Sequence, residues 1–244
     1  MSGMWIDDDS VRWALAGRPA TAEEAIAALR DHPLLLLMHG YGSFEGDLIE
    51  LAPQLPGGFV CASPRAPLVA PPPVVNGYAW FPIPFGPYLL PLPHVAPAEF
   101  VGSEPHRAAI AALEWIDALD ARVEGGLREI ALMGFSQGGA MVTSLLRLRP
   151  ERFACGVNCS GFVAPGAHAD DERLAARRPP LFWGRDTADP IVSEQRVAFT
   201  AAWSPAHTEL EARLYPGIAH SISAEEVADI AAFLTRHVDG AARQ

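Results

Sequence analysis

Ser136 has the sequence surroundings of a catalytic nucleophile. It lies in "GFSQG" at 134–138, which fits the pattern G-x-S-x-G, and the apolar run "IALM" comes directly before it. Where a strand turns sharply into a helix, a serine at the turn projects its Oγ above the sheet, and flanking glycines avoid the collisions that larger side chains would cause. The pattern therefore predicts a nucleophilic Ser136, with capping of the following helix as the alternative role.

A serine nucleophile needs a general base, because its hydroxyl is unreactive at its ordinary pKa. In one large class of serine hydrolases the acid and then the histidine follow the serine along the chain. This order restricts the base to His168, His207, His220 and His237. We favour His220, which lies in "YPGIAHSIS" between an expected strand and an expected helix. Loops beyond the carboxyl ends of strands are where such sheets carry active-site groups.

The acid that orients the histidine is expected after the next strand beyond Ser136. The segment "LFWGRDTADPIV" at 181–192 offers Asp186 and Asp189. Asp186 has the alternative role of a turn residue, and Asp189, which precedes Pro190, that of a helix cap. A triad acid remains ionised and stabilises the imidazolium that forms beside it. We favour Asp189, and the residues alone leave both aspartates open.

Two backbone N–H groups are expected to hold the negative oxygen of the tetrahedral intermediate. One belongs to Gln137, the residue after the nucleophile, and the other comes from the loop after an early strand. The segment "MHGYGS" at 38–43 supplies that loop, and its glycines free the backbone so that Tyr41 presents its N–H. His39 is interpreted as a structural histidine that holds this loop.

Short apolar runs without alternation predict strands that are covered on both faces, and therefore a mostly parallel sheet. The segment "TELEARLY" alternates instead, which predicts a half-exposed strand near an edge. The expected strands lie at 33–40, 58–63, 128–134, 153–160, 179–184 and 208–215, and helical patterns at 21–30, 103–123, 136–150, 191–203 and 223–238 separate them. This alternation predicts an α/β fold with helices flanking the sheet. No linker divides the chain, so a single domain over residues 1–244 is expected.

One proline-rich segment does not fit this alternation. Eleven of the 23 prolines fall between Pro64 and Pro97. Proline removes a backbone donor and fixes φ, which excludes a regular helix or a central strand over most of this segment. We expect a loop insertion near 64–97, extending to about residue 100, that borders the pocket, with Trp80 and Phe81 in the pocket wall. The alternative is a surface excursion whose aromatic side chains pin it to the core.

The composition excludes several classes of function. A net charge of −11 and a pI of about 5.1 repel phosphate backbones, so no nucleic-acid partner is expected. The three cysteines fit neither a disulfide framework nor a zinc site, and we expect small apolar side chains near buried strands, with no metal or cofactor. The run "LLLLM" at 34–38 is too short to span a bilayer. These features, with an N-terminal segment unlike a secretory signal, predict a cytoplasmic protein without stable membrane insertion.

The motifs together resemble those of the phospholipase/carboxylesterase family of α/β-hydrolases, which includes bacterial carboxylesterases and acyl-protein thioesterases. The matching segments run in order along the chain: "LLLMHGYGS", "ASPRAP", "NGYAWFPI", "GFSQGGAM", "TADPIV" and "YPGIAHSISAEEVADIAAFL". The resemblance implies an α/β-hydrolase fold and a metal-independent serine esterase. By position it assigns the nucleophile to Ser136, the acid to Asp189 before Pro190, and the base to His220.

The resemblance implies hydrolysis of small-molecule carboxylic esters through an acyl-enzyme. Short to medium acyl chains are expected, and thioesters suit the same machinery. The alternatives are a ligand-binding or regulatory module with little hydrolysis, and a peptidase or C–C hydrolase on the same scaffold. The chain departs from the family pattern at Ser43, where an Asp is usual, at Trp183-Gly184, where His-Gly is usual, and in the segment "PFGPYLLPLPHVAP".

Overall fold

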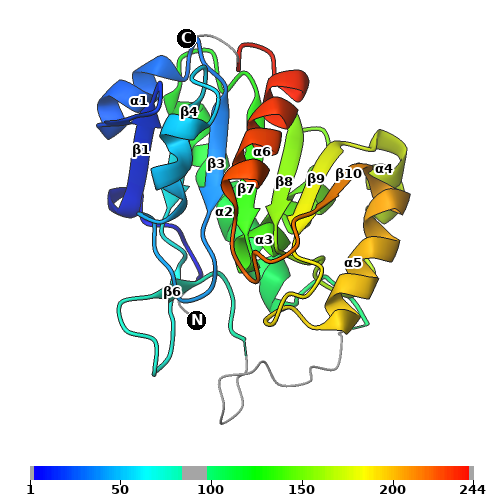
Figure 1. Ribbon diagram of the computed structural model, residues 1–244. Coiled ribbons are helices and arrows are strands. Elements are labelled where there is room, and N and C mark those ends of the chain that lie inside the picture. The colour runs from blue at the N-terminus through cyan, green and yellow to red at the C-terminus, as the bar shows by residue number, and fades with distance from the viewer. Residues whose placement is uncertain (1–2, 84–97, 242–244) are drawn as a thin grey trace.

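The computed structural model describes residues 3–83 and 98–241 of the chain, and its centre is an eight-stranded sheet (Figure 1). The strand order is β10-β9-β8-β7-β3-β4-β1-β2. The strands are β1 (Val11–Leu15), β2 (Arg18–Ala20), β3 (Leu34–Met38), β4 (Val60–Pro64), β7 (Ile130–Phe135), β8 (Cys155–Cys159), β9 (Pro180–Arg185) and β10 (Glu209–Leu214).

Six of these strands pair in parallel, from β10 through to β4, which confirms the mostly parallel sheet. They are the six strands that the sequence predicts. Strands β3, β4 and β8 are buried at every position because helices cover both faces of the sheet. Strand β10 is an edge strand, as expected from its alternation, but it is more exposed than predicted. Only Leu210 of its three apolar residues is half-buried, and Leu214 is 54% exposed.

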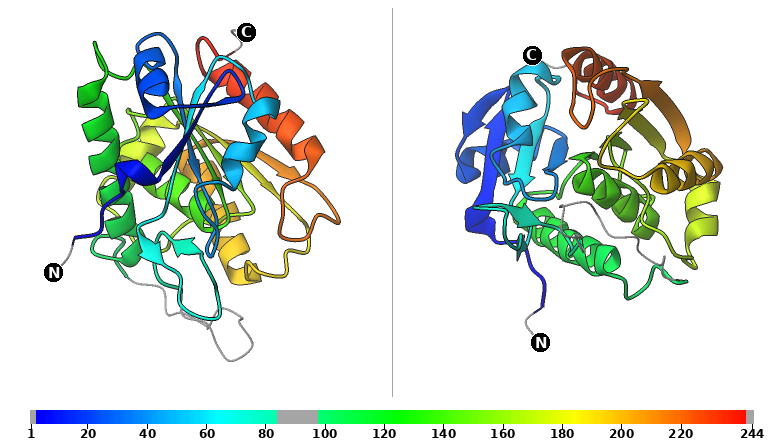
Figure 2. Two further views of the ribbon diagram at one scale, coloured as in Figure 1. Left: turned by 90° about the vertical axis from the view of Figure 1, so that its left-hand side faces the viewer. Right: turned by 60° about the horizontal axis from the view of Figure 1, so that its bottom comes forward.

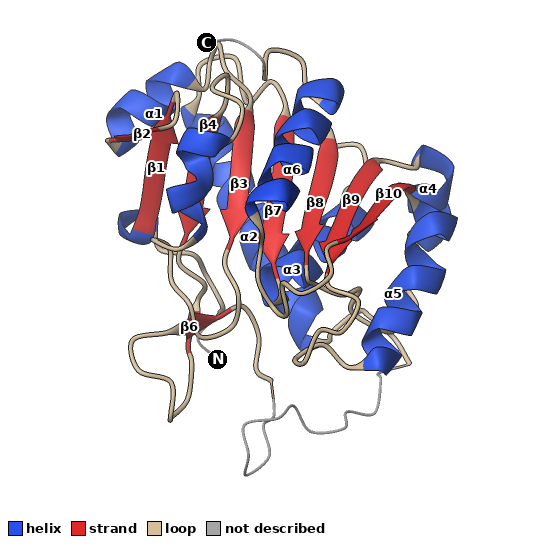
Figure 3. Ribbon diagram, in the orientation of Figure 1, coloured by secondary structure: helices blue, strands red, loops and turns tan. Residues whose placement is uncertain are grey.

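Helices lie on both faces of the sheet, which Figure 2 shows edge-on and Figure 3 shows by element type. One apolar core joins the sheet to α1 (Ala22–Ala28), α2 (Glu104–Arg122), α3 (Gln137–Leu148), α4 (Asp171–Arg177) and α5 (Glu194–His207). The other joins it to η2 (Leu48–Gln54) and α6 (Ala224–His237). A 3-10 turn, η1 (Asp8–Ser10), precedes β1. Three of the helices begin with a serine cap, at Ser103, Ser193 and Ser223.

Sequence patterns did not predict the first two strands or helix α4. Strand β1 pairs antiparallel with both β4 and β2, so it is built on a different pattern from the rest of the sheet. Strand β2 has only three residues, "RPA", and its proline is tolerated because this strand forms the sheet edge. Helix α4 buries only Leu174, so it has no apolar stripe.

The proline-rich segment carries no regular helix or long strand over its described part, residues 64–83 and 98–100. Two-residue strands β5 (Leu68–Val69) and β6 (Tyr78–Ala79) form a small antiparallel ladder there. This ladder lies below the carboxyl ends of the parallel strands in Figure 1. The remainder of the predicted insertion, 84–97, lies outside the described residues. Within the described residues, no helix is both long and apolar enough to cross a lipid bilayer.

Candidate active site

Ser136 occupies the turn between β7 and α3, as the sequence predicts. Its backbone is strained, with φ 54° and ψ −112°, and its side chain makes no capping hydrogen bond to the helix. The glycines around it are sterically required. A Cβ on Gly134 would lie 2.1 Å from the carbonyl oxygen of Gly138, and a Cβ on Gly138 would lie 1.8 Å from that of Met38. The turn therefore presents the serine hydroxyl instead of using it as a cap.

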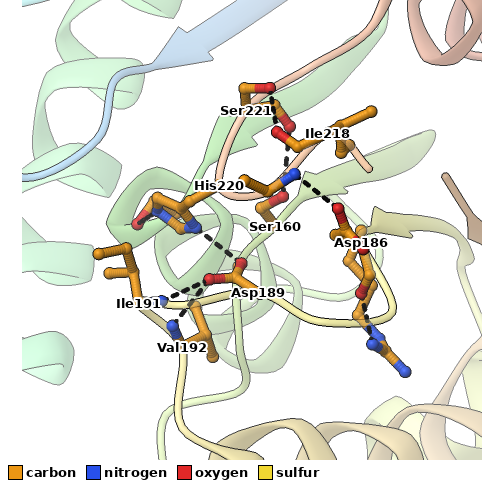
Figure 4. A network of polar contacts seen from close by, with 12 residues as sticks. Ser160, Asp186, Asp189, Ile191, Val192, Ile218, His220 and Ser221 are labelled. Atoms are coloured by element: carbon orange, nitrogen blue, oxygen red, sulfur yellow. Dashed lines mark hydrogen bonds and ion pairs between the residues drawn. The ribbon is translucent and has the colours of Figure 1, made fainter. Parts of the chain in front are cut away.

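The Ser136 hydroxyl contacts His220, and His220 contacts Asp189. The distance from His220 Nε2 to Ser136 Oγ is 2.9 Å, and from His220 Nδ1 to Asp189 Oδ2 it is 2.7 Å. With the imidazole proton on Nδ1, that N–H donates to the carboxylate and Nε2 accepts the serine O–H. The three residues come from three loops, after β7, β9 and β10. Figure 4 shows Asp189 beside the ring of His220.

The Asp189 carboxylate is buried and its geometry is fixed from both sides. Its side chain is 3% exposed, against 15% for that of His220. While Oδ2 contacts the imidazole, Oδ1 accepts hydrogen bonds from the backbone N–H groups of Ile191 at 2.7 Å and Val192 at 3.0 Å. These two N–H groups lie before α5, whose N-cap is Ser193, so Asp189 does not have the alternative role of a helix cap. Each carboxylate oxygen has its own partners: Oδ2 contacts the imidazole, and Oδ1 bonds the backbone of its own loop.

Asp186 does not contact the imidazole. It is buried, and its Oδ2 accepts from the backbone N–H of Ala219 at 2.5 Å, while Oδ1 accepts from the N–H of Ala188 and the hydroxyl of Thr187. The Ala188 N–H, followed by that of Ala219 and by Thr187, lowers the pKa of this carboxyl below its ordinary value. Ala219 has φ 55°, so Asp186 stabilises a strained residue directly before His220.

The loop that carries His220 is fixed by other contacts as well. Ser221 Oγ donates to the carbonyl of Ile218 at 2.7 Å, and Ser160 Oγ donates to the carbonyl of Ser221 at 3.4 Å (Figure 4). The ring of Phe135 lies 4.9 Å from that of His220. The sequence did not indicate a role for Ser160, because it directly follows β8 (Cys155–Cys159), a strand with no motif of its own.

The other three candidate histidines lie elsewhere in the structure. His207, at the end of α5, stacks on the ring of Trp203 and bonds the Trp203 carbonyl. His237, at the end of α6, lies beside Phe233. His168 packs against Phe100. The preference for His220 over them agrees with the contacts.

The two expected oxyanion donors come from neighbouring strand ends. Strands β3 and β7 pair with Met38 opposite Gly134, so the loop with Tyr41 and the start of α3 with Gln137 emerge side by side. The Tyr41 loop is held by hydrogen bonds from Gly42 N–H to the carbonyl of Tyr78 at 2.8 Å and from Tyr78 N–H to that of Ser43 at 2.8 Å. The start of α3 also directs the positive end of the helix dipole at the site.

His39 is the structural histidine that the sequence indicates. It is fully buried, its Nδ1 contacts the carbonyl of Gly40 at 2.8 Å, and its Nε2 accepts from the N–H of Ala66 at 3.1 Å. Burial lowers its pKa, which favours the neutral ring that can accept this bond.

An ion pair beneath the Tyr41 loop was not predicted. Arg65 donates two hydrogen bonds to the buried Glu45, at 2.8 and 2.6 Å, and its guanidinium lies 4.6 Å from the ring centre of Tyr78. Bonding to Arg65 lowers the pKa of Glu45. Arg65 belongs to "ASPRAP", and the lone arginine in that motif was the available signal. Ser43, where the family usually has an Asp, donates to Asp47 at 2.5 Å.

The structure places Trp80 and Phe81, which the sequence predicts in the pocket wall, in an apolar core cluster. Trp80 is 0% exposed and Phe81 is 5% exposed. Both residues belong to the core below the site. Their aromatic composition indicated a pocket wall, but it fits the alternative, in which aromatic side chains pin the proline-rich segment to the core.

The cysteines and the metal-ligating residues offer no second chemistry in the described part of the chain. Cys61, Cys155 and Cys159 are free and buried, and burial raises the pKa of the first two thiols to about 12, which keeps them protonated and unreactive. No group of three or more His, Cys, Asp or Glu side chains in residues 3–83 and 98–241 is placed to hold a metal ion.

A serine on a strand-to-helix turn of a mostly parallel sheet, bonded to a histidine that is bonded to an aspartate, defines the α/β-hydrolase class of serine hydrolases. A model of the Phospholipase/Carboxylesterase family matches residues 22–238, and the chain belongs to this family. The fold and the family that the sequence predicts are both confirmed.

Curated relatives and solved structures are similar over most of the chain. A protein of Oryza sativa subsp. japonica named "Probable carboxylesterase" is 30% identical, over 92% of this chain and 85% of its own. Acyl-protein thioesterase 1 of Candida albicans is 28% identical, over 91% and 96%. The crystal structure of a carboxylesterase from Mesorhizobium loti shares the fold, with a TM-score of 0.67, 19% identity, and coverage of 94% and 97%.

Proposed function

We propose that this protein is a serine carboxylesterase that hydrolyses small-molecule carboxylic esters through an acyl-enzyme. Ser136 is the nucleophile, His220 the general base and acid, and Asp189 the carboxylate that orients the imidazole. The observation that carries the proposal is the continuous hydrogen-bonded chain from Ser136 Oγ through His220 to Asp189 Oδ2. A non-hydrolytic module would have no use for a strained serine that caps nothing.

Acylation begins when Ser136 Oγ attacks the carbonyl carbon of the ester. His220 Nε2, 2.9 Å away, takes the hydroxyl proton as the C–O bond forms, and Asp189 stabilises the imidazolium from the other side of the ring. The carbonyl oxygen becomes an oxyanion, for which the N–H groups of Gln137 and Tyr41 are the proposed donors. His220 then returns the proton to the alkoxide oxygen, and the alcohol leaves.

Deacylation repeats the same steps with water. His220 removes a proton from a water molecule as its oxygen attacks the acyl carbon, the oxyanion forms again, and the proton passes to Ser136 Oγ as the acid leaves. This second half restores the free enzyme, so no cofactor is consumed.

Short to medium acyl chains are the proposed substrates, with thioesters as a second class. A thiolate is a better leaving group than an alkoxide, so the same residues suffice for both. The relatives named carboxylesterase and acyl-protein thioesterase support both classes without deciding between them. The arrangement as a single domain over residues 1–244 and the cytoplasmic location also remain proposals.

The test is hydrolysis of p-nitrophenyl esters from acetate to decanoate, together with acyl-thioesters followed by thiol release. Wild-type protein is expected to turn over, and Ser136→Ala is expected to lose all but a trace of activity. Ser144→Ala is the matched control, because Ser144 lies in the same helix and bonds only a helix carbonyl. Equal rates for wild type and Ser136→Ala would overturn the proposal.

A further inference from the structure

The segment Trp80–Phe81 is bonded to both halves of the expected oxyanion hole. The backbone N–H of Trp80 donates to Gln137 Oε1 at 2.8 Å, and Gln137 Nε2 donates to the carbonyl of Phe81 at 2.7 Å. The indole N–H of Trp80 donates to the carbonyl of His39 at 2.9 Å. One short segment therefore contacts the residue that follows the nucleophile and the strand end that leads into Tyr41.

These three bonds are shielded from water. Gln137 is 1% exposed and Trp80 is 0% exposed. The two ends of the carboxamide face a backbone donor and a backbone acceptor, so a flipped amide would oppose like groups and only one orientation is satisfied. Buried polar groups that lose such partners cost the full desolvation penalty, and the Gln137 side chain is correspondingly immobile.

The bonds fix the peptide groups that carry the expected donors. Gln137 is the first residue of α3, and anchoring its side chain on the 80–81 backbone holds its own N–H against rotation of the turn. The indole of Trp80 holds the carbonyl of His39, two residues before Tyr41. The His39 ring is bonded in turn to Gly40 and Ala66, so this strand end is held at both the main chain and the side chain.

We propose that Trp80 and the side chain of Gln137 are positioning residues that hold the two oxyanion donors at a fixed separation. This inference rests on the proposed function, because it assigns the Gln137 and Tyr41 N–H groups to an oxyanion. Electrostatic stabilisation is effective when the donors are in place before charge develops, and loss of one donor costs about 10²–10³ in kcat. A donor that is displaced but present should cost less, about 10-fold.

Trp80→Phe tests the support of the strand end that leads into Tyr41. It removes the indole N–H that bonds the carbonyl of His39 and keeps an aromatic ring. We expect kcat to fall about 10-fold with KM nearly unchanged, and the affinity for a trifluoromethyl ketone, which forms an oxyanion on Ser136, to fall in step with kcat. Trp115→Phe is the matched control, because the indole of Trp115, in α2, donates to Asp8 at 2.7 Å and to neither expected oxyanion donor. Unchanged kcat in a folded Trp80→Phe variant would overturn the inference.

Gln137→Glu tests the bonds between the side chain of residue 137 and the 80–81 backbone. It keeps the size of the side chain, so it separates the effect of these bonds from that of packing. A protonated glutamate still donates to Phe81 and accepts from Trp80, whereas the ionised form opposes the Phe81 carbonyl. We expect kcat relative to wild type to be highest at acidic pH and to fall as pH rises. A ratio that is constant with pH would contradict a positioning role. This variant also keeps the inference testable if Trp80→Phe does not fold.

Hydrogen exchange distinguishes failure of the inference from failure of the proposed function, since it requires no turnover. In Trp80→Phe, amides of residues 38–43 should exchange faster than in wild type and in Trp115→Phe. Faster exchange in a protein whose wild type hydrolyses no ester would overturn the proposed function alone. Unchanged exchange would overturn the inference, whatever the activity.

Discussion

Asp186 and Asp189 lie three residues apart on one loop, yet they hold His220 in different ways. Asp189 bonds the imidazole at Nδ1, so it contacts the ring that we propose as the general base. Asp186 bonds the backbone N–H of Ala219, so it acts on the chain that delivers the ring. Of two neighbouring buried carboxylates, only Asp189 contacts the histidine that we propose as the base. What matters is the atom that each carboxylate reaches.

The two aspartates also differ in the other groups that their carboxylates bond. Asp189 shares its carboxylate between the imidazole and the backbone N–H groups of Ile191 and Val192 in its own loop. Asp186 is bonded within its own turn and to the strained residue Ala219. Loss of Asp189 should therefore affect the chemical step, whereas loss of Asp186 should affect the position of a histidine that is chemically intact.

Asp189→Asn should have the largest effect. The amide would present the wrong partner to Nδ1 and would not stabilise the imidazolium, and kcat should fall on the order of 10⁴-fold by analogy with other serine hydrolase triads. Steady-state kinetics on a p-nitrophenyl ester measure this effect. A larger loss in Asp186→Asn than in Asp189→Asn would exchange the two roles and refute the assignment.

Asp186→Asn should have a smaller effect, roughly 10²-fold in kcat, the scale of a misplaced catalytic group. The pH–rate profile should keep its shape, because the His220–Asp189 contact remains. A second readout is acid unfolding. Since the pKa of Asp186 is lowered by folding, its stabilisation is present above the pKa of the unfolded chain and is lost as pH falls through the lowered value. The variant should therefore lose less stability than wild type over that range; an identical loss would argue against this account of Asp186.

Glu226 is a buried carboxylate whose surroundings differ from those of Asp186. Glu226 is fully buried in α6, and its oxygens lack the backbone N–H partners that Asp186 has; the thiol of Cys159 lies beside them. Burial raises the pKa of Glu226 from 4.5 to about 7. Its contribution to stability is present below the unfolded value of 4.5 and is lost as pH rises through about 7, because the folded protein must then hold a buried charge.

Glu226→Gln should therefore stabilise the protein at alkaline pH and have little effect at pH 4. The gain at pH 8 should be on the order of 3 kcal/mol or less, measured by urea unfolding at both values. Glu225→Gln, one residue away and exposed, should show no such pH dependence. Equal effects at both pH values would contradict a raised pKa for Glu226.

The sequence predicted the parts of the site that local sterics determine. Ser136 was identifiable because only glycine at 134 and 138 allows the turn, and glycine is visible in any sequence. The parallel strands were identifiable because strands covered on both faces lose their alternation. The carboxylate that contacts His220 was harder to predict, since Asp186 and Asp189 both follow β9 and only the loop geometry decides which one faces the ring.

The roles of Trp80 and Gln137 depend on contacts between segments far apart in sequence. Gln137 bonds residues more than fifty positions away, and no local pattern carries that information. Aromatic residues in a proline-rich loop can face a pocket or the core, and exposure, which decides between them, is a property of the packed structure. The antiparallel strand β1 escaped prediction for the same reason, because its partners β4 and β2 define it.

The most direct test of the account is covalent labelling of Ser136. Wild-type protein is incubated with a fluorophosphonate, digested and examined by mass spectrometry, with Asp189→Asn and Asp186→Asn alongside. We predict one adduct per chain on the peptide that contains Ser136, slow labelling in Asp186→Asn and slower labelling in Asp189→Asn. An unlabelled Ser136, or an adduct on another residue, would contradict the account.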